Sequence, residues 1–322
     1  MKKTTAYIWM SAMVVLSVAI FSAITFLDLG PALKPIVASA NPTGGDPEFR
    51  QSFYGSFENP LNKPMDVTKI GDRIYVTDTK NTQVQVYDQN GNNVLKFGKA
   101  GTDKGQFQFP YGIAGDEDEN IYVADMYNGN ISIFNAKGEF IKYFPDKDKA
   151  IQSPAGLRIY DEKLYVTDIK SNKLLIFNLE GKKLMEIGSA GQDEGKFIAP
   201  NAVAVNKDNH QIYVTDSGNN RVQVFDEDGK FLNVINGSKD GKGSPLFVNP
   251  RGVALDSNGT VYIVSNLSHN IYAYDKDGKE VQILGGMGTE NGKLYLPNGL
   301  YIDDRDEIFV TDTINQRVSV FY

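Results

Sequence analysis

The chain has 322 residues, a net charge of −7 and no cysteine, which excludes a disulfide framework and a thiolate metal site. An acidic chain without a cluster of basic residues repels phosphate backbones, so we expect no nucleic-acid partner. The length suggests about two domains, but a repeat array of this size can form a single body.

The N-terminus has the pattern of a membrane anchor. Residues 6–27 carry no charge and follow Lys2 and Lys3. At about 1.5 Å per residue, a helix of this length crosses the hydrocarbon core of a bilayer. The two lysines favour a cytoplasmic N-terminus. We therefore predict a single-pass transmembrane helix in residues 1–28, with the remaining chain extracytoplasmic at the cell membrane. The alternative is a signal peptide cleaved near Ala40, which would release a secreted protein.

Residues 29–48 form a spacer in this interpretation. They contain four prolines and the pair Gly44-Gly45. Proline removes backbone donors and glycine adds chain entropy, so we expect no folded unit here.

From residue 49 onward, the chain repeats one β-rich phrase six times. The copy at 212–229 reads IYVTDSGNNRVQVFDEDG. Successive copies begin 43 to 49 residues apart, at Ile74, Ile121, Leu164, Ile212, Val261 and Ile308. The fourth repeat contains four β-runs, at 201–205, 212–216, 221–226 and 230–235. Four antiparallel strands in roughly 40–50 residues are typical of a propeller blade. We predict an all-β, six-bladed β-propeller over residues 49–322.

The two ends of this region are expected to share a blade. The sixth repeat stops at Tyr322, after its third β-run, while an additional β-run, FRQSFYGSF, occupies residues 49–57. We predict that this run supplies the missing fourth strand, because an open ring would leave two unpaired sheet edges.

The repeats resemble the NHL family. The resemblance rests on P-x-G-[IV]-A, [IV]-Y-V-T-D and N-x-R-[VI]-x-V-F, which are clearest at 200–225 and 297–321. It extends over residues 49–322. It implies a six-bladed propeller that binds protein, peptide or nucleic acid on one face, and we expect a protein of the bacterial cell envelope. A minority of similar propellers are metal-dependent lyases or lactonases.

An aspartate ends the second β-run of five repeats, and Ser265 takes its place in the fifth repeat. The five are Asp78, Asp125, Asp168, Asp216 and Asp312. We interpret them as fold determinants that accept backbone N–H groups of the following loop. A ring of carboxylates around a channel is also a candidate site for a divalent cation. His210 and His269 are expected at opposite ends of a blade, where they cannot share one ion.

Binding residues are sought where the repeats differ. The position after the proline that opens each repeat varies, and its side chains are expected to surround one mouth of the channel, exposed to a partner. Tyr127 should reach the same face from a loop. The predicted partner-binding residues are Tyr111, Tyr127, Asn201, Arg251 and Asn298. Ordinary loop variation explains the same differences.

These observations favour a binding or assembly scaffold over an enzyme. The expected partner is a protein or peptide of the envelope, with no cofactor and no catalytic residue. The alternative is a metal-dependent hydrolase or lyase with a divalent cation at the channel mouth. The sequence assigns no oligomeric state.

Overall fold

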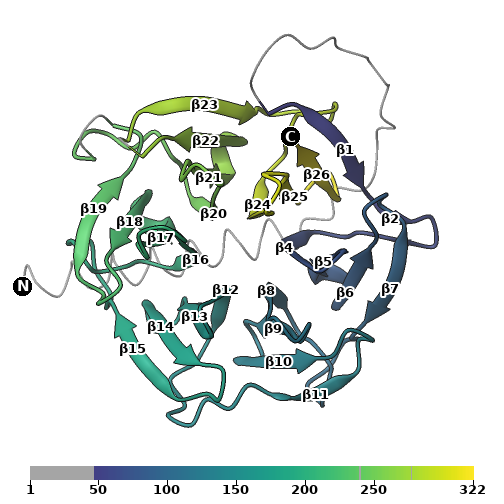
Figure 1. The fold of residues 1–322 in the computed structure, drawn as a ribbon. Coiled ribbons are helices and arrows are strands. Elements are labelled where there is room, and N and C mark those ends of the chain that lie inside the picture. The colour runs from purple at the N-terminus through teal and green to yellow at the C-terminus, as the bar shows by residue number, and fades with distance from the viewer. Residues whose placement is uncertain (1–46, 239–240, 277) are drawn as a thin grey trace, which may run out of the picture. The chain divides into compact units, whose positions relative to one another are not determined.

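Six four-stranded antiparallel sheets surround a common axis in the computed structural model (Figure 1). The structure describes residues 47–238, 241–276 and 278–322, all within one compact unit, Val37–Tyr322. It confirms the predicted six-bladed β-propeller. The predicted anchor and residues 29–46 of the spacer lie outside the described residues. None of the helices in the described part has the length and apolarity that a membrane crossing requires.

Each blade begins with its innermost strand and proceeds outward. Blade 1 contains β4 (Pro64–Ile70), β5 (Arg73–Asp78), β6 (Gln83–Tyr87) and β7 (Asn93–Phe97). Blade 2 contains β8 (Pro110–Gly115), β9 (Ile121–Asp125), β10 (Asn130–Phe134) and β11 (Phe140–Tyr143). Blade 3 contains β12 (Pro154–Tyr160), β13 (Lys163–Asp168), β14 (Lys173–Asn178) and β15 (Lys183–Ile187).

The second half of the ring has the same order. Blade 4 contains β16 (Pro200–Val205), β17 (Ile212–Asp216), β18 (Arg221–Phe225) and β19 (Phe231–Ile235). Blade 5 contains β20 (Pro250–Leu255), β21 (Val261–Ser265), β22 (Asn270–Tyr274) and β23 (Glu280–Gly285). Blade 6 contains β24 (Pro297–Ile302), β25 (Ile308–Asp312), β26 (Arg317–Phe321) and β1 (Phe49–Phe53). Three of the loops between second and third strands contain a short 3-10 helix: η1 (Thr79–Asn81), η2 (Ser217–Asn219) and η3 (Asn266–Ser268).

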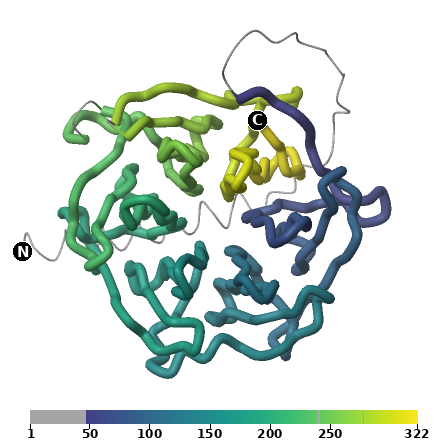
Figure 2. The backbone as a smooth tube through the Cα atoms, in the orientation of Figure 1, coloured from purple at the N-terminus to yellow at the C-terminus, as the bar shows by residue number. Residues whose placement is uncertain are grey.

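The chain ends close the ring, as the sequence predicts. Strand β1 pairs with β26 in antiparallel register, with Phe53 opposite Val318, and Figure 2 shows the purple segment that contains β1 beside the yellow C-terminal end. The strand is shorter than the predicted run 49–57. Gly55 has φ +84° and is the first residue of β2 (Gly55–Ser56). This strand pairs with β3 (Asn59–Pro60) in a separate two-stranded sheet. A backbone with positive φ turns the chain away from the blade.

The core consists of six apolar clusters, one between each pair of neighbouring blades. The cluster that joins blade 6 to blade 1 includes Phe53, Val67, Tyr87, Phe309 and Val318. Both faces of every blade are therefore covered, which explains why the middle strands are apolar at nearly every position.

Close approach of the innermost strands depends on the glycine of the P-x-G motif. A Cβ at Gly112 would collide with the carbonyl oxygen of Ala155 in the next blade. Threonines of the second strands also link neighbouring blades through hydrogen bonds. Thr77 Oγ1 donates a hydrogen bond to the carbonyl of Tyr111 at 2.7 Å, and Thr167 Oγ1 donates to that of Asn201 at 2.8 Å. The motif residues thus set the packing of blade on blade.

Candidate functional site

The innermost strands enclose a cavity of about 480 Å³. All six blades contribute to its lining through β4, β8, β12, β16, β20 and β24. This volume lies within the range of roughly 300–1,000 Å³ that is usual for small-molecule sites. The cavity extends to the face that carries the turns between first and second strands, where Lys207, Asp256 and Asp304 line its mouth. We call this face the turn face. The opposite face carries the connections between blades, and we call it the connection face.

Near the connection face, Tyr111 crosses the channel. Its hydroxyl lies 2.9 Å from Asn201 Oδ1 of blade 4 and 3.0 Å from Asn298 Oδ1 of blade 6. Asn298 Nδ2 in turn donates to the sulfur of Met65 at 3.2 Å. Since these four side chains are buried, they form a polar floor to the cavity.

This arrangement corrects the expectation of an exposed rim. The structure brings Tyr111, Asn201 and Asn298 together, but it buries all three against one another. Arg251 is half-buried and lines the cavity. Tyr127 alone is well exposed, at 54%, and its ring stacks on Phe109 with centroids 4.7 Å apart. The sequence placed these side chains near the channel but gave no information on how they contact one another across it.

Asp66 and Arg158 lie in the wall of the cavity, together with other charged residues. Asp66 accepts hydrogen bonds from the backbone N–H groups of Val67 and Ile113. Burial raises the pKa of Asp66 to about 7, against the opposing effects of these hydrogen bonds and of Arg158. Arg158 places its guanidinium 5.4 Å from the ring centroid of Tyr301, on the blade opposite. Burial therefore favours the neutral form of the Asp66 carboxyl group more than in an exposed aspartate.

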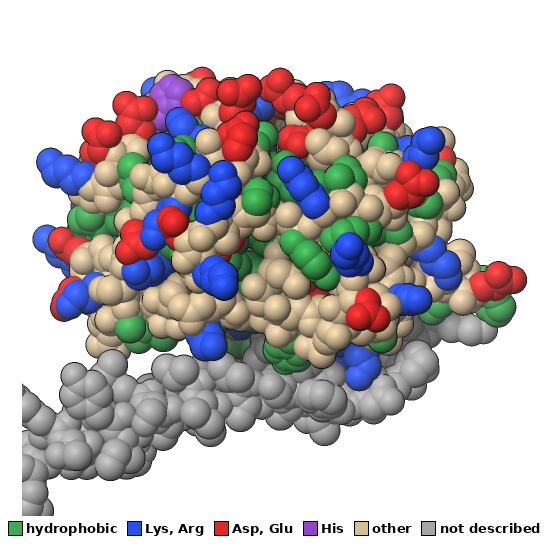
Figure 3. All heavy atoms as spheres, turned by 90° about the horizontal axis from the view of Figure 1, so that it is seen from below, with side chains coloured by type: hydrophobic (Ala, Val, Ile, Leu, Met, Phe, Trp, Pro, Cys, Tyr) green, Lys and Arg blue, Asp and Glu red, His purple; other side chains and the backbone are tan. Residues whose placement is uncertain are grey.

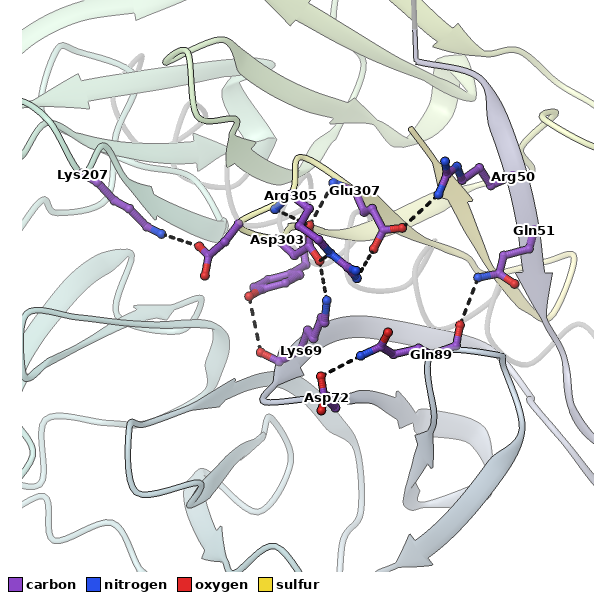
Figure 4. A network of polar contacts seen from close by, with 11 residues as sticks. Arg50, Gln51, Lys69, Asp72, Gln89, Lys207, Asp303, Arg305 and Glu307 are labelled. Atoms are coloured by element: carbon purple, nitrogen blue, oxygen red, sulfur yellow. Dashed lines mark hydrogen bonds and ion pairs between the residues drawn. The ribbon is translucent and has the colours of Figure 1, made fainter.

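Ion pairs surround the mouth on the turn face. Lys69 of blade 1 binds Asp303 of blade 6, and Lys207 of blade 4 binds Asp304 at 2.9 Å (Figure 4). Burial of Asp303 opposes its ionisation, but Lys69 and backbone N–H donors outweigh burial and hold the pKa of Asp303 below its ordinary value. Arg305 also approaches Asp303, at 3.6 Å. The nearly buried Lys69–Asp303 pair links the blade 6 turn to blade 1, whereas the exposed Lys207–Asp304 pair contributes little to stability.

The repeated aspartates are structural in this fold. Asp125 accepts backbone N–H groups from Gln108 and Phe109 in the connection before its blade, and from Tyr127 and Asn128 in the loop after its strand. Asp78, Asp168, Asp216 and Asp312 make related contacts and are fully buried. Each carboxylate thus ties a connection to a blade, which supports their interpretation as fold determinants.

The two histidines lie on opposite faces of the propeller. His210 belongs to the turn between β16 and β17, whereas His269 follows η3. His269 Nδ1 accepts the backbone N–H of Leu296, and burial lowers the pKa of His269. Within the described ranges, no group of three histidine or carboxylate side chains is arranged to hold a metal ion.

Sequence reasoning overlooked Asp66, Arg158 and Tyr301. A signal was present in the repeats. The second position after the opening proline is glycine in four repeats and alanine in one, but Asp66 in the first. The fourth position is alanine in three repeats and threonine in one, but Arg158 and Tyr301 in the third and sixth. Large or charged residues at positions that otherwise hold small ones mark the wall of the channel.

A family model described as "6-bladed beta-propeller" matches residues 56–143 and 145–222, just over half of the chain. The chain belongs to this family. An NHL repeat model matches residues 294–321 and confirms the resemblance found in the sequence. A model of the SMP-30/Gluconolactonase/LRE-like region matches residues 184–285.

Solved structures share the fold at low identity. An auxiliary nutrient binding protein from Bacteroides thetaiotaomicron has a TM-score of 0.63 at 12% identity, with 83% of this chain and 71% of that chain covered. Virginiamycin B lyase from Staphylococcus aureus, in a catalytically inactive form with Quinupristin, has a TM-score of 0.59 at 13% identity, covering 85% and 99%. The WD40 β-propeller domain of Doa1 has a TM-score of 0.59 at 10% identity, covering 86% and 97%. These likenesses concern the fold and do not assign an activity.

Proposed function

We propose that this propeller is a membrane-anchored, extracytoplasmic scaffold that binds a protein or peptide of the envelope on its connection face. The observation that carries the proposal is a group of exposed apolar side chains at blade 5, which we call the blade 5 patch: Leu246, Val248, Leu267 and Met287. Exposed apolar groups that gather on one face are typical of interaction sites.

Backbone contacts hold the blade 5 patch together. The N–H of Leu267 in η3 donates to the carbonyl of Val248 at 3.2 Å. The N–H of Gly286, which precedes Met287, donates to the carbonyl of His269 at 2.9 Å. The connections before and after blade 5 therefore both contact the loop that contains η3. Tyr127 presents a further aromatic surface on the same face, of the kind that is enriched in protein interfaces.

Affinity capture from the native envelope tests the proposal. We compare the wild type with Leu267→Asp, which introduces a charge into the patch, and with Leu184→Asp as a matched control on the outer strand β15. Both leucines are 46% exposed, so the control matches the test variant in exposure and in the chemical change. Loss of captured proteins with Leu267→Asp alone supports the proposal. Identical capture by all three proteins refutes it.

The membrane topology is tested by cysteine labelling, because the chain has no cysteine of its own. Ser257 is exposed on the turn face. In intact cells, a Ser257→Cys variant should react with a membrane-impermeant maleimide and remain in the membrane fraction. Protection from the reagent would contradict the extracytoplasmic placement, and release into the medium with a shortened chain would identify a cleaved signal peptide.

A second candidate function is a metal-dependent hydrolase or lyase that acts at the channel mouth. The specific observation in its favour is the carboxyl group of Asp66, whose pKa of about 7 suits general acid–base chemistry in an enclosed cavity. Metal analysis of the purified protein, with and without chelator, tests this alternative. Stoichiometric divalent metal in the purified protein would favour the enzyme. A protein that contains no such metal before chelation would refute the metal-dependent alternative.

A further inference from the structure

Arg158 crosses the cavity from one side to the other. It lies on β12 of blade 3, is half-buried, and reaches the ring of Tyr301 on β24 of blade 6. Blades 3 and 6 are opposite one another in a ring of six (Figure 1). A charged side chain in this place faces the cavity interior instead of bulk solvent.

The guanidinium of Arg158 has no hydrogen-bond acceptor among the residues that the structure describes, and its contact is the face of the Tyr301 ring. Arg317 provides a contrast within the same chain. It donates to Asp312, to the hydroxyl of Tyr54 and to two backbone carbonyls. An arginine with a purely structural role uses its five donors in this way. The donors of Arg158 are available to a ligand in the cavity.

The floor of the cavity offers another donor. The side chain of Asn201 is buried, and its Nδ2 has no partner among the described residues. A buried polar group without a partner destabilises the fold. A ligand oxygen that reaches Asn201 would remove this cost.

The mouth of the cavity has the opposite charge. Asp208, Asp256, Asp304 and Asp306 line it, and Lys207 is neutralised by Asp304. In the side view of Figure 3, Asp and Glu side chains gather along one face of the propeller. The cavity is thus polarised, with a cation in its interior and carboxylates at its entrance. A simple anion would be repelled at this entrance, whereas a molecule with an anionic and a cationic end matches both regions.

We propose that the cavity binds a small zwitterion, an amino acid or short peptide, with its carboxylate on Arg158 and its ammonium group toward the aspartates of the mouth. The inference does not depend on the scaffold function, which concerns the connection face. Asp66 lies in the same wall, and because burial raises its pKa, its carboxyl group repels the bound carboxylate less than an exposed aspartate would.

The test uses trialanine as a zwitterionic probe and measures its binding to the full-length protein by calorimetry. Trialanine amide lacks the carboxylate, and N-acetyl-trialanine lacks the ammonium group. We expect trialanine to bind most tightly and the amide to bind roughly ten- to a hundredfold more weakly, because charge-assisted hydrogen bonds are lost. Arg158→Gln should weaken trialanine by a similar factor, whereas Arg73→Gln, at an exposed arginine outside the cavity, should not.

Three outcomes would overturn the proposal. These are no detectable binding of trialanine by the wild type, equal affinity for trialanine and its amide, and unchanged affinity in Arg158→Gln. The comparison of trialanine with its amide uses the wild type alone, so it decides the question even if the Arg158 variant fails to fold.

Discussion

Phe53→Ala tests whether the N-terminal strand closes the propeller. Phe53 is the last residue of β1 and is 2% exposed. It packs in the cluster between blades 6 and 1, and its ring stacks on Tyr87 of blade 1 with centroids 5.6 Å apart. The side chain therefore connects the first blade to the strand that completes the last one.

The expected loss follows from these contacts. Truncation of a buried phenylalanine destabilises by about 3–5 kcal/mol, which includes an aromatic pair of about 0.5–1.5 kcal/mol. For a domain of this size, each kcal/mol corresponds to about 2 °C in the melting temperature. We therefore expect a decrease of roughly 6–10 °C for Phe53→Ala.

Phe57→Ala is the matched control. It makes the same chemical change four residues later, at a side chain that is fully exposed, and should alter stability by less than about 0.5 kcal/mol. Thermal unfolding of both full-length variants, followed by circular dichroism, provides the comparison. Equal melting temperatures for Phe53→Ala and Phe57→Ala would refute the assignment of β1 as the closing strand.

Two further predictions concern the channel. Because the pKa of Asp66 is raised to about 7 in the folded state, the folded protein binds this proton more tightly than the unfolded chain, and stability should fall as pH rises from about 4 to 7. The difference is at most about 4 kcal/mol. In Asp66→Asn this component should vanish from urea-unfolding curves measured across that range, and identical pH profiles for the two proteins would contradict it. Gly112→Ala should destabilise by about 1–3 kcal/mol, since its methyl group would collide with the carbonyl of Ala155. An unchanged urea midpoint for Gly112→Ala would show that the innermost strands can separate without cost.

Much of the architecture was predictable because a blade is a local structure. Runs such as IYVTD and RVQVF, with turn glycines such as Gly229 at φ +80°, specify strands and hairpins from neighbouring residues alone. Six copies and an additional run at residue 49 then imply a closed ring. The end of that run at Phe53 instead of residue 57 depended on the conformation of Gly55, which the β-rich composition of the segment concealed.

The residue pattern alone predicted the number of blades and the strand that closes them, and it favoured a structural role for the repeated aspartates. The contacts between side chains across the channel became known only from the folded structure. The Tyr111 hydroxyl meets Asn201 and Asn298, which are 90 and 187 residues away, and Arg158 meets Tyr301 of the opposite blade. No local pattern encodes these distances, because they follow from the radius of a ring of six blades. The same geometry buried three of the five predicted binding residues, Tyr111, Asn201 and Asn298, and opened a cavity toward the opposite face.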